Sequence, residues 1–335
     1  MTEHHLDAAI DFIETPVEDT AFDEQLPDQQ ATPSQLNMAG QTDDSKPVSL
    51  WGDAWKIMRL RPLFWLAAVL IVVFVLMAAW PQLFTHADPT LCPLEMSRQP
   101  PSVNHIFGND FQGCDIYART IYGARASIMV GVLTAVFTAL VGAVLGTIAG
   151  YVGGWLDSVL SRLADIFFAI PLLLGAIVLM YSFPLSPDSP YLLKILRLVL
   201  ALVLFSWPNI FRLMRSSIMQ VKPNEYMLAA RALGVKPMRL VTSHAVPNAL
   251  APVIVVATID LGTYIATEAT LSFLGIGLPG GIISWGRAIS DASGLGFIRL
   301  TPFMLLFPAL FLCLTVLSFI LMGEVVRDAL DPKLR

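Results

Sequence analysis

The stretch SIMVGVLTAVFTALVGAVLGTIAGYVGGW, residues 127–155, contains no charged side chain and decides the fold class of this chain. About 20 apolar residues in an α-helix, rising 1.5 Å each, cross the hydrocarbon layer of a bilayer. A soluble core of the same size would interrupt such a block with charged positions more often. Residues 127–155 therefore predict a transmembrane helix. The uncharged blocks 166–187 and 300–323 predict two more.

The composition of the chain fits a membrane protein with several spans. Of its 335 residues, 55% are hydrophobic and only 14% are charged, which is unusual for a soluble domain. Of three further apolar blocks, one is uncharged, one carries Lys194 and Arg197 near an end where basic side chains can snorkel, and one carries two acidic residues. The predicted fold is an all-α membrane protein with six transmembrane helices, at about residues 63–80, 127–150, 166–185, 192–211, 248–273 and 301–322.

The distribution of Lys and Arg predicts the orientation of the spans. If the N-terminus is cytoplasmic, 14 of the 21 basic residues lie on the cytoplasmic side and 7 lie outside. Cytoplasmic loops carry an excess of Lys and Arg, so the count favours both termini in the cytoplasm. In this orientation residues 81–125 form an outer loop rich in Pro and Gly, and residues 212–247 form a cytoplasmic loop.

Residues 1–47 differ in composition from the rest of the chain. They contain eleven acidic residues against the single basic residue Lys46, and they lack apolar periodicity. Such a segment cannot bury enough apolar surface to fold alone, so we expect a disordered acidic cytoplasmic tail, with a regulatory docking role as the alternative. The transmembrane domain then covers residues 48–335. Without the tail this domain is mildly basic, and nothing in it indicates nucleic-acid binding.

The chain shows no pattern of residues typical of catalysis or metal binding. Neither a Ser/His/Asp constellation nor a zinc or haem spacing stands out, and we interpret His105 and His244 as structural. The phosphate-binding pattern G-x-x-x-x-G-K-[ST] is missing as well, so this chain is not expected to hold a nucleotide. Cys92 and Cys114 both fall in the outer loop, where an oxidising exterior would permit a disulfide. Their spacing leaves a bond and free thiols equally open.

The cytoplasmic loop contains the most informative stretch, KPNEYMLAARALGVKPMRLVTSHAVPN, residues 222–248. Asn224 is a suitable N-cap for a short helix that Gly234 ends. Pro237 can open a second helix, and Pro247 marks the entry into the next span. Two short helices with small alanine side chains would form a knob that fits a groove on a soluble protein. An amphipathic loop lying on lipid headgroups explains the same residues equally well.

This loop resembles the EAA loop of permease subunits in bacterial ABC importers. The resemblance rests on Ala229-Ala230, on Gly234 four residues later and on Pro247 thirteen residues after that. The family usually has Glu at the position of Leu228, so this chain lacks one charge expected in the family. The resemblance implies that the loop docks on an ATPase subunit. The residues implied in that contact are Glu225, Leu228, Ala229, Ala230, Arg231, Gly234, His244 and Pro247.

Four more segments resemble the C-type permeases of dipeptide, oligopeptide and nickel importers. They are the region before the second span, EATLSFLG at residues 268–275, the turn Ser284-Trp285-Gly286, and RDALDP at residues 327–332. In the first segment the matching residues are His105, Phe107, Gly108, Asp110, Gly113, Asp115, Arg119, Tyr122, Gly123, Ala124, Arg125 and Ser127. Apart from the resemblance, Trp285 is interpreted as an interfacial anchor. The similarity covers about residues 50–335.

The resemblance implies a type I ABC importer permease fold in a bacterial inner membrane, with both termini in the cytoplasm. Such a subunit pairs with a second, homologous permease, and the two enclose the translocation path. Two cytoplasmic ATPase subunits would bind ATP and Mg, and an extracytoplasmic substrate-binding protein would deliver the substrate, whereas this chain would need no cofactor. The implied substrates are short peptides, with nickel or another small solute as the nearest alternative.

Asp260 and Glu268 lie eight residues apart in one predicted span, two turns apart on roughly one face. A charged group at membrane depth costs about 2.5–3.5 kcal/mol on insertion scales, so such residues usually face a cavity or a partner. These two residues either line the path, contact the partner permease or only fix the packing of the helices. For Glu268 we favour the packing role. An alternative from a different class is a stand-alone secondary transporter that relays protons through these carboxyl groups.

Overall fold

The computed structural model describes residues 50–330 of the chain, and the predicted acidic tail at residues 1–47 lies outside them. The described part is helical, and its one strand-like feature is an isolated bridge between Asn109 and Asp115. Five of its helices are long and apolar enough to cross a membrane, and a bent helix pair makes a sixth span if it counts as one. The predicted all-α membrane fold is confirmed.

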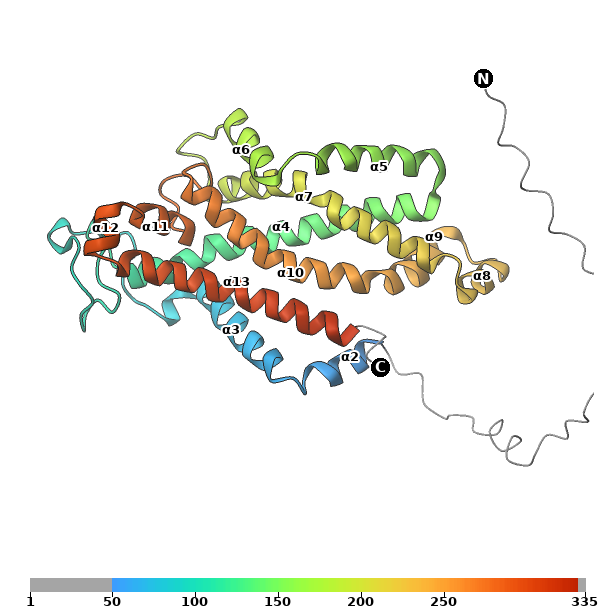
Figure 1. The fold of residues 1–335 in the computed structure, drawn as a ribbon, viewed down its shortest axis with the longest axis horizontal. Coiled ribbons are helices and arrows are strands. Elements are labelled where there is room, and N and C mark those ends of the chain that lie inside the picture. The colour runs from blue at the N-terminus through green and yellow to red at the C-terminus, as the bar shows by residue number, and fades with distance from the viewer. Residues whose placement is uncertain (1–49, 331–335) are drawn as a thin grey trace, which may run out of the picture. The chain divides into compact units, whose positions relative to one another are not determined.

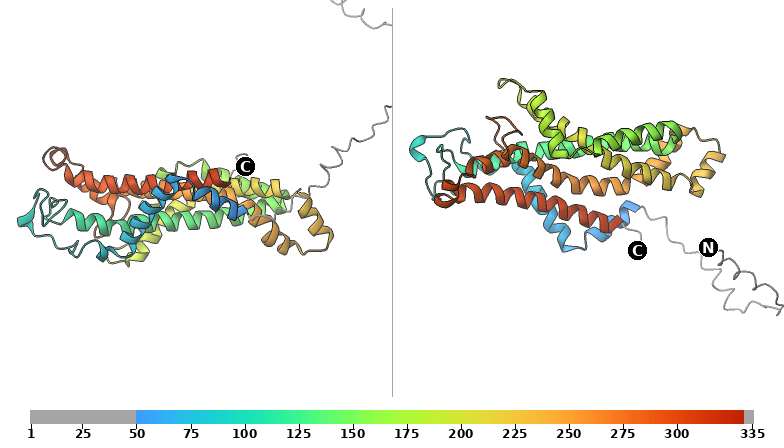
Figure 2. Two further views of the ribbon diagram at one scale, coloured as in Figure 1. Left: turned by 90° about the horizontal axis from the view of Figure 1, so that it is seen from below. Right: turned by 45° about the horizontal axis from the view of Figure 1, so that its top comes forward.

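Figure 1 shows the order of the helices along the described part of the chain. The span helices are α3 (Pro62–Ala79), α4 (Ile116–Val152), the bent pair α5 (Gly154–Phe168) and α6 (Leu172–Ser182), α7 (Tyr191–Val221), α10 (Val246–Phe273) and α13 (Phe303–Leu330). The shorter elements are α2 (Leu50–Met58), the 3-10 turns η1 (Pro81–Leu83) and η2 (Leu94–Met96), α8 (Glu225–Ala232), α9 (Pro237–Leu240), the π-helical turn η3 (Val241–Ala245), α11 (Trp285–Ala292) and α12 (Leu295–Leu300). The helices α8 and α9 lie at one end of the spans, and α11 and α12 lie at the other (Figures 1 and 2). We call these the α8 end and the α11 end.

Helix α3 shows how an apolar block becomes a membrane helix. Pro62 occupies its first turn, where the missing N–H costs nothing, and Arg61 precedes it. Val69 is 59% exposed and Val72 is 55% exposed, so this helix presents an apolar surface suited to lipid. At the α8 end, an ion pair between Arg61 and Asp328 of α13 joins the start of α3 to another span.

The helices α4 and α7 form the most extensive helix pair of the fold. Gly142, Gly146 and Gly150 recur every four residues along α4. A Cβ on Gly142 would lie 2.6 Å from the Cβ of Ile210, and a Cβ on Gly146 would lie 2.6 Å from the backbone oxygen of Phe211. The glycines therefore let the two backbones approach more closely than larger side chains would allow, as small-residue repeats do in other membrane helices.

Helix α4 begins eleven residues before the predicted start of its span, because it is capped. The carboxylate of Asp115 accepts a hydrogen bond from the backbone N–H of Ala118 at 2.9 Å, as expected of an N-cap aspartate. Hydropathy marks only the part of a helix that suits lipid, whereas the cap decides where the helix starts. The predicted outer loop 81–125 is therefore shorter and ends at residue 115.

Helix α7 also extends beyond its predicted end at residue 211 and continues to Val221. Its additional turns carry Arg215, which donates to the carboxylate of Asp157 on α5 at 2.6 Å. Arg212 donates to Asp165, also on α5, at 2.7 Å. The predicted cytoplasmic loop 212–247 thus begins as helix, because ion pairs with α5 hold these turns in place.

The predicted span 166–185 is wrong as a single straight helix. The structure has α5 and α6 in its place, with a bend of 85° between them. Pro171 has no N–H to donate and disfavours helical backbone at the preceding residue, Ile170. The first helix consequently ends at Phe168, and the second begins at Leu172.

Candidate functional site

The loop between α7 and α10 folds into the short helices α8 and α9, which stand at the α8 end (Figure 1). Helix α8 begins directly after Asn224, the predicted N-cap, although the Asn224 side chain makes no capping hydrogen bond. Met227 and Leu240 are buried, one from each loop helix, and they belong to a core cluster with Ile218 of α7 and Val253 of α10. Because close-packed interiors transmit displacement, a force on the loop acts on both spans.

The opposite side of the loop presents apolar side chains. Leu228 is 50% exposed, and Leu233 and Met238 are exposed still further. Of the predicted contact residues, the exposed ones are Glu225, Leu228, Ala229, Arg231, Gly234 and Pro247, and His244 is half-buried. Ala230 differs from the expectation that the alanines form the outer surface. It is buried against the spans, and it therefore fixes the loop in place.

Helix α8 ends in a cap that depends on glycine. The N–H of Gly234 donates to the carbonyl of Arg231 at 3.0 Å. The N–H of Val235 donates to the carbonyl of Ala230 at 3.2 Å. This pair of bonds is a Schellman motif, in which the first donor adopts left-handed backbone. Gly234 has φ +78°, a conformation that only glycine adopts at little cost.

A π-helical turn, η3, joins the loop to α10. Pro247 has no N–H for the carbonyl of Ser243, so one bond of a regular helix is lost here. The side chain of Asn248 donates to the carbonyl of His244 at 2.6 Å. Since π-helical turns are frequent at functional sites, this joint between the loop and the span belongs to the candidate site.

Asp260 lies in the middle of α10 and is half-buried. The side chain of Asn209 on α7 lies near its carboxyl group. One turn further along α10, the hydroxyl of the buried Tyr264 lies beside the hydroxyls of Ser206 on α7 and Thr138 on α4. Within residues 50–330, Asp260 forms no ion pair. Polar side chains from three spans thus meet at membrane depth.

Glu268 has a different environment from Asp260, although a shared face was predicted. It is completely buried, and the hydroxyl of Ser272 donates to its Oε1 at 2.7 Å. Ser127 of α4 and Ser284, which caps α11, lie near the same carboxyl group. Its Oε2 has no hydrogen-bond partner in the described part of the chain. Glu268 therefore belongs to the contact of α10 with α4 and α11.

Trp285 lies in the same contact and is not an interfacial anchor. It is completely buried, its Nε1–H donates to the carbonyl of Thr120 at 2.8 Å, and its backbone N–H donates to the hydroxyl of Ser127 at 3.3 Å. The next residue, Gly286, has no room for a side chain, since a Cβ would lie 2.5 Å from the Cα of Ala269. Helix α11 is consequently seated closely on both α4 and α10.

Replacing Glu268 with alanine is expected to destabilise this contact by about 2–4 kcal/mol, because it leaves a cavity and removes the acceptor of the Ser272 hydroxyl proton. Glu268→Gln keeps the shape and adds N–H donors next to the serine oxygens, so its stability should at least equal that of the parent chain. Thermal unfolding of each purified variant in detergent measures its stability relative to the parent chain. Equal melting temperatures of the alanine variant and the parent chain would remove Glu268 from the packing role.

A disulfide between Cys92 and Cys114 ties the outer loop to the start of α4. Beside it, Nδ1 of His105 lies 2.8 Å from Oδ2 of Asp115, the carboxylate that caps α4. The loop is thus held against the first turn of α4 at two points, one covalent and one polar.

Serine at both positions 92 and 114 is expected to loosen the outer loop and to leave the spans intact. In the chain-entropy model a crosslink across about 20 residues contributes about 3 kcal/mol, here for a sequence separation of 22. Limited proteolysis of the purified chain should therefore cut residues 81–115 faster in the variant. Identical cleavage rates in the oxidised parent chain and the variant would contradict this role.

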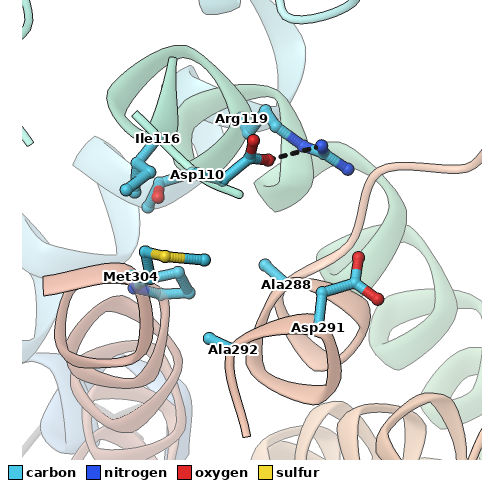
Figure 3. Close-up of a pocket in the computed structure, with 9 residues that line it drawn as sticks. Asp110, Ile116, Arg119, Ala288, Asp291, Ala292 and Met304 are labelled. Atoms are coloured by element: carbon cyan, nitrogen blue, oxygen red, sulfur yellow. Dashed lines mark hydrogen bonds and ion pairs between the residues drawn. The ribbon is translucent and has the colours of Figure 1, made fainter. Parts of the chain in front are cut away.

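Figure 3 shows a small cavity at the α11 end, between the outer loop, α4, α11 and α13. Arg119 donates to Asp110 at 2.8 Å on one side of it, and Ala288 and Met304 line the other side. Its volume is 20 Å³, which is room for about one water molecule. This cavity cannot hold a peptide or a cofactor, and the ion pair serves to fix the loop.

A larger cleft of 590 Å³ opens at the same end, lined among others by His86, Asp88 and Arg125. Arg125 donates to the carbonyl of Ala78 at the end of α3, at 3.0 Å. Hydrogen bonds from the side chain and backbone of Thr90 lower the pKa of the exposed Asp88 carboxyl. Within residues 50–330, no group of three or more His, Cys, Asp or Glu side chains could hold a metal ion.

Two features of these sites were missed in the sequence. The repeat Gly142, Gly146, Gly150 follows the small-xxx-small spacing of membrane helix contacts, and that spacing would have predicted it. No comparable signal pointed to Asn209, because its neighbour Asp260 lies on another span. Only the packing of α7 against α10 brings the two side chains together.

Two models of known protein families match parts of this chain. Residues 142–335 match the family model of the binding-protein-dependent transport system inner membrane component. Residues 49–101 match the model of the N-terminal TM domain of oligopeptide transport permease C. Together the two models cover most of the described residues.

Individual relatives agree with these family matches. The oligopeptide transport system permease protein OppC of Bacillus subtilis is 39% identical over 87% of this chain and 92% of its own length. OppC of Escherichia coli K12 is 38% identical over 85% of this chain and 92% of its own length. The dipeptide permease DppC of Alkalihalophilus pseudofirmus is 36% identical over 88% of this chain and 93% of its own length. Among solved structures, the inward-facing MetNI methionine ABC transporter matches with a TM-score of 0.50 and 19% identity, over 63% of this chain and 96% of that one, which supports the fold alone.

Proposed function

Because this chain belongs to the inner membrane components of binding-protein-dependent transport systems, we propose that it forms half of an ATP-driven translocation path for short peptides. The proposed substrate class is inferred from the names of the relatives, which agree with one another. Proteins named oligopeptide or dipeptide permeases from three bacteria are 36–39% identical to it over more than nine-tenths of their own length. The family match also makes the chain a multi-pass protein of a bacterial inner membrane. Nickel or another small solute is the nearest alternative substrate.

A transport system of this kind also contains a substrate-binding protein and ATPase subunits. The sequence of this chain has no phosphate-binding loop, which supports ATP and Mg binding in the ATPase subunits and none in this chain. A second, homologous permease would complete the path as a heterodimer. The α8 end then faces the cytoplasm, and the α11 end with its disulfide faces the outside, in agreement with the Lys and Arg distribution.

The loop of α8 and α9 is the proposed contact with one ATPase subunit. Its exposed apolar side chains, among them Leu228, Leu233 and Met238, suit a groove on a soluble partner. Its buried side chains Met227 and Leu240 pack with residues of α7 and α10. Closure of the ATPase subunits would therefore move these two spans through the loop, a rigid-body transition between inward and outward access.

The test is reconstitution of the whole complex. The chain is co-expressed with its companion permease and ATPase subunits, purified in mild detergent, placed in liposomes and assayed for uptake of a labelled tripeptide or Ni²⁺. We expect peptide uptake that requires both ATP and the binding protein. Uptake of Ni²⁺ without peptide would establish the alternative substrate. Uptake by this chain alone, driven by a proton gradient and without an ATPase, would establish the proton-coupled secondary transporter.

A further inference from the structure

The exposed surface of α10 differs from that of α3. On α3 the exposed residues are mostly large and apolar, for example Val69 and Val72. Between residues 255 and 272 of α10, the exposed positions are Thr263 and Thr270. No large hydrophobic side chain in this stretch is more than 36% exposed. Asp260 lies in the same segment and is half-buried, and an ionisable group at membrane depth is unsuited to lipid, so this side of α10 faces water or protein.

The polar residues of this surface share one side of the helix. Asp260, Thr263, Thr267 and Thr270 are spaced by three, four and three residues. At roughly 100° per residue these positions fall within a sector of about 80°. The stripe runs from the middle of α10, beside Asn209 of α7, to the last turn of the helix at the α11 end.

The hydrogen bonds within the stripe make it a surface of hydrogen-bond acceptors. The hydroxyl of Thr267 donates to the carbonyl of Thr263 at 2.8 Å, and the hydroxyl of Thr270 donates to the carbonyl of Ala266 at 2.8 Å. Their protons are used within the helix, so each oxygen offers only lone pairs outward. Asp260 is acceptor-only when ionised, and it forms no ion pair within residues 50–330.

We propose that this stripe, Asp260, Thr263, Thr267 and Thr270, lines the translocation path and binds the donor-rich, positively charged amino end of a peptide. The inference rests on the proposed transport function and names the part of the substrate that this chain contacts. An ammonium group offers three N–H donors and a positive charge, which complements a carboxylate followed by hydroxyl lone pairs. Binding at several weak sites along one side of a helix also suits a path that must release its substrate.

Access of water to the stripe tests the first part of the proposal. Thr267→Cys is introduced in a Cys313→Ser background, which removes the exposed free thiol of α13. The control is Val69→Cys on the lipid-suited surface of α3, where the parent side chain is 59% exposed. In the reconstituted complex, a membrane-impermeant maleimide should label position 267, in the resting state or with a non-hydrolysable ATP analogue, and should leave position 69 unlabelled. No labelling of position 267 in either state assigns the stripe to the contact with the partner permease and overturns the proposal.

Uptake kinetics test the second part. Asp260→Asn keeps the shape of the side chain and removes the charge, so tripeptide uptake should fall by about tenfold or more, the effect of losing a charge-assisted hydrogen bond. The amount of assembled complex should stay at the level of the parent, and Asp260→Glu should restore most of the uptake. Unchanged uptake in Asp260→Asn overturns the proposal, as does loss of assembly, which assigns Asp260 to packing. A parent complex that takes up no peptide would instead refute the proposed function, so the two failures are distinguishable.

Discussion

Replacing Gly146 with leucine is expected to prevent accumulation of the folded chain. A Cβ at this position would lie 2.6 Å from the backbone oxygen of Phe211 and 2.9 Å from the Cβ of Met214. Backbone cannot move aside as a flexible side chain can, so α4 and α7 would have to separate along their contact. Overpacking in a well-packed interior costs about 1–3 kcal/mol, and more when the neighbour is rigid. The measurement is the yield of monodisperse chain in detergent by size-exclusion chromatography, together with its melting temperature.

The control for this substitution lies on the same helix. Val144 is 50% exposed, so Val144→Leu changes the surface of α4 and not its contact with α7. Gly146→Ala should give an intermediate loss, because the methyl group alone already meets the Phe211 oxygen. A folded Gly146→Leu chain that melts like the parent would show that the two helices do not pack this closely.

Hydropathy predicted the order of the spans, and five of them as single helices, because the cost of placing charges in lipid dominates the composition of those segments. It could not predict where the helices end. The start of α4 depends on the carboxylate of Asp115, and the last turns of α7 depend on ion pairs with α5, such as Arg215 with Asp157. Both are contacts of polar groups, to which an apolar window is insensitive. The bend at Pro171 had a local signal, but the uncharged block around it masked that signal.

The candidate sites were predictable to different degrees. Gly234 and Pro237 have conformational requirements that can be read locally, and they do bound the short helices of the loop. Which alanine faces outward was not predictable, because Ala229 and Ala230 have the same side chain, and only packing on α7 and α10 buries the second. The environment of Asp260 likewise depends on a neighbour from another span.

Replacing Gly234 with valine is expected to uncouple ATP hydrolysis from peptide uptake, with uptake reduced by about tenfold or more if the loop is the ATPase contact. Left-handed backbone at a residue with a side chain costs about 1–2 kcal/mol, and a β-branched side chain is the least suited to it. Gly234 has φ +78°, and a Cβ there would meet nothing within 4 Å in the chain itself. The change therefore acts on the cap of α8 and on the docked partner, not on the interior. The measurement is the number of ATP molecules hydrolysed per tripeptide taken up by the reconstituted complex.

The α11 end offers a matched control for this variant. Gly275 ends α10 with φ +77° and also has open space around its Cβ position. It donates to the carbonyl of Ser272 at 3.1 Å, followed by a bond from Ile276 to Leu271 at 3.0 Å, the same Schellman motif as at Gly234. Gly275→Val thus imposes the same backbone cost far from the ATPase contact, and its ratio of ATP to peptide should stay at the parent value. A normal ratio in Gly234→Val would show that the loop of α8 and α9 does not transmit the motion. Since α8 then serves only to cover α7 and α10, the coupling contact would have to be sought elsewhere at the α8 end.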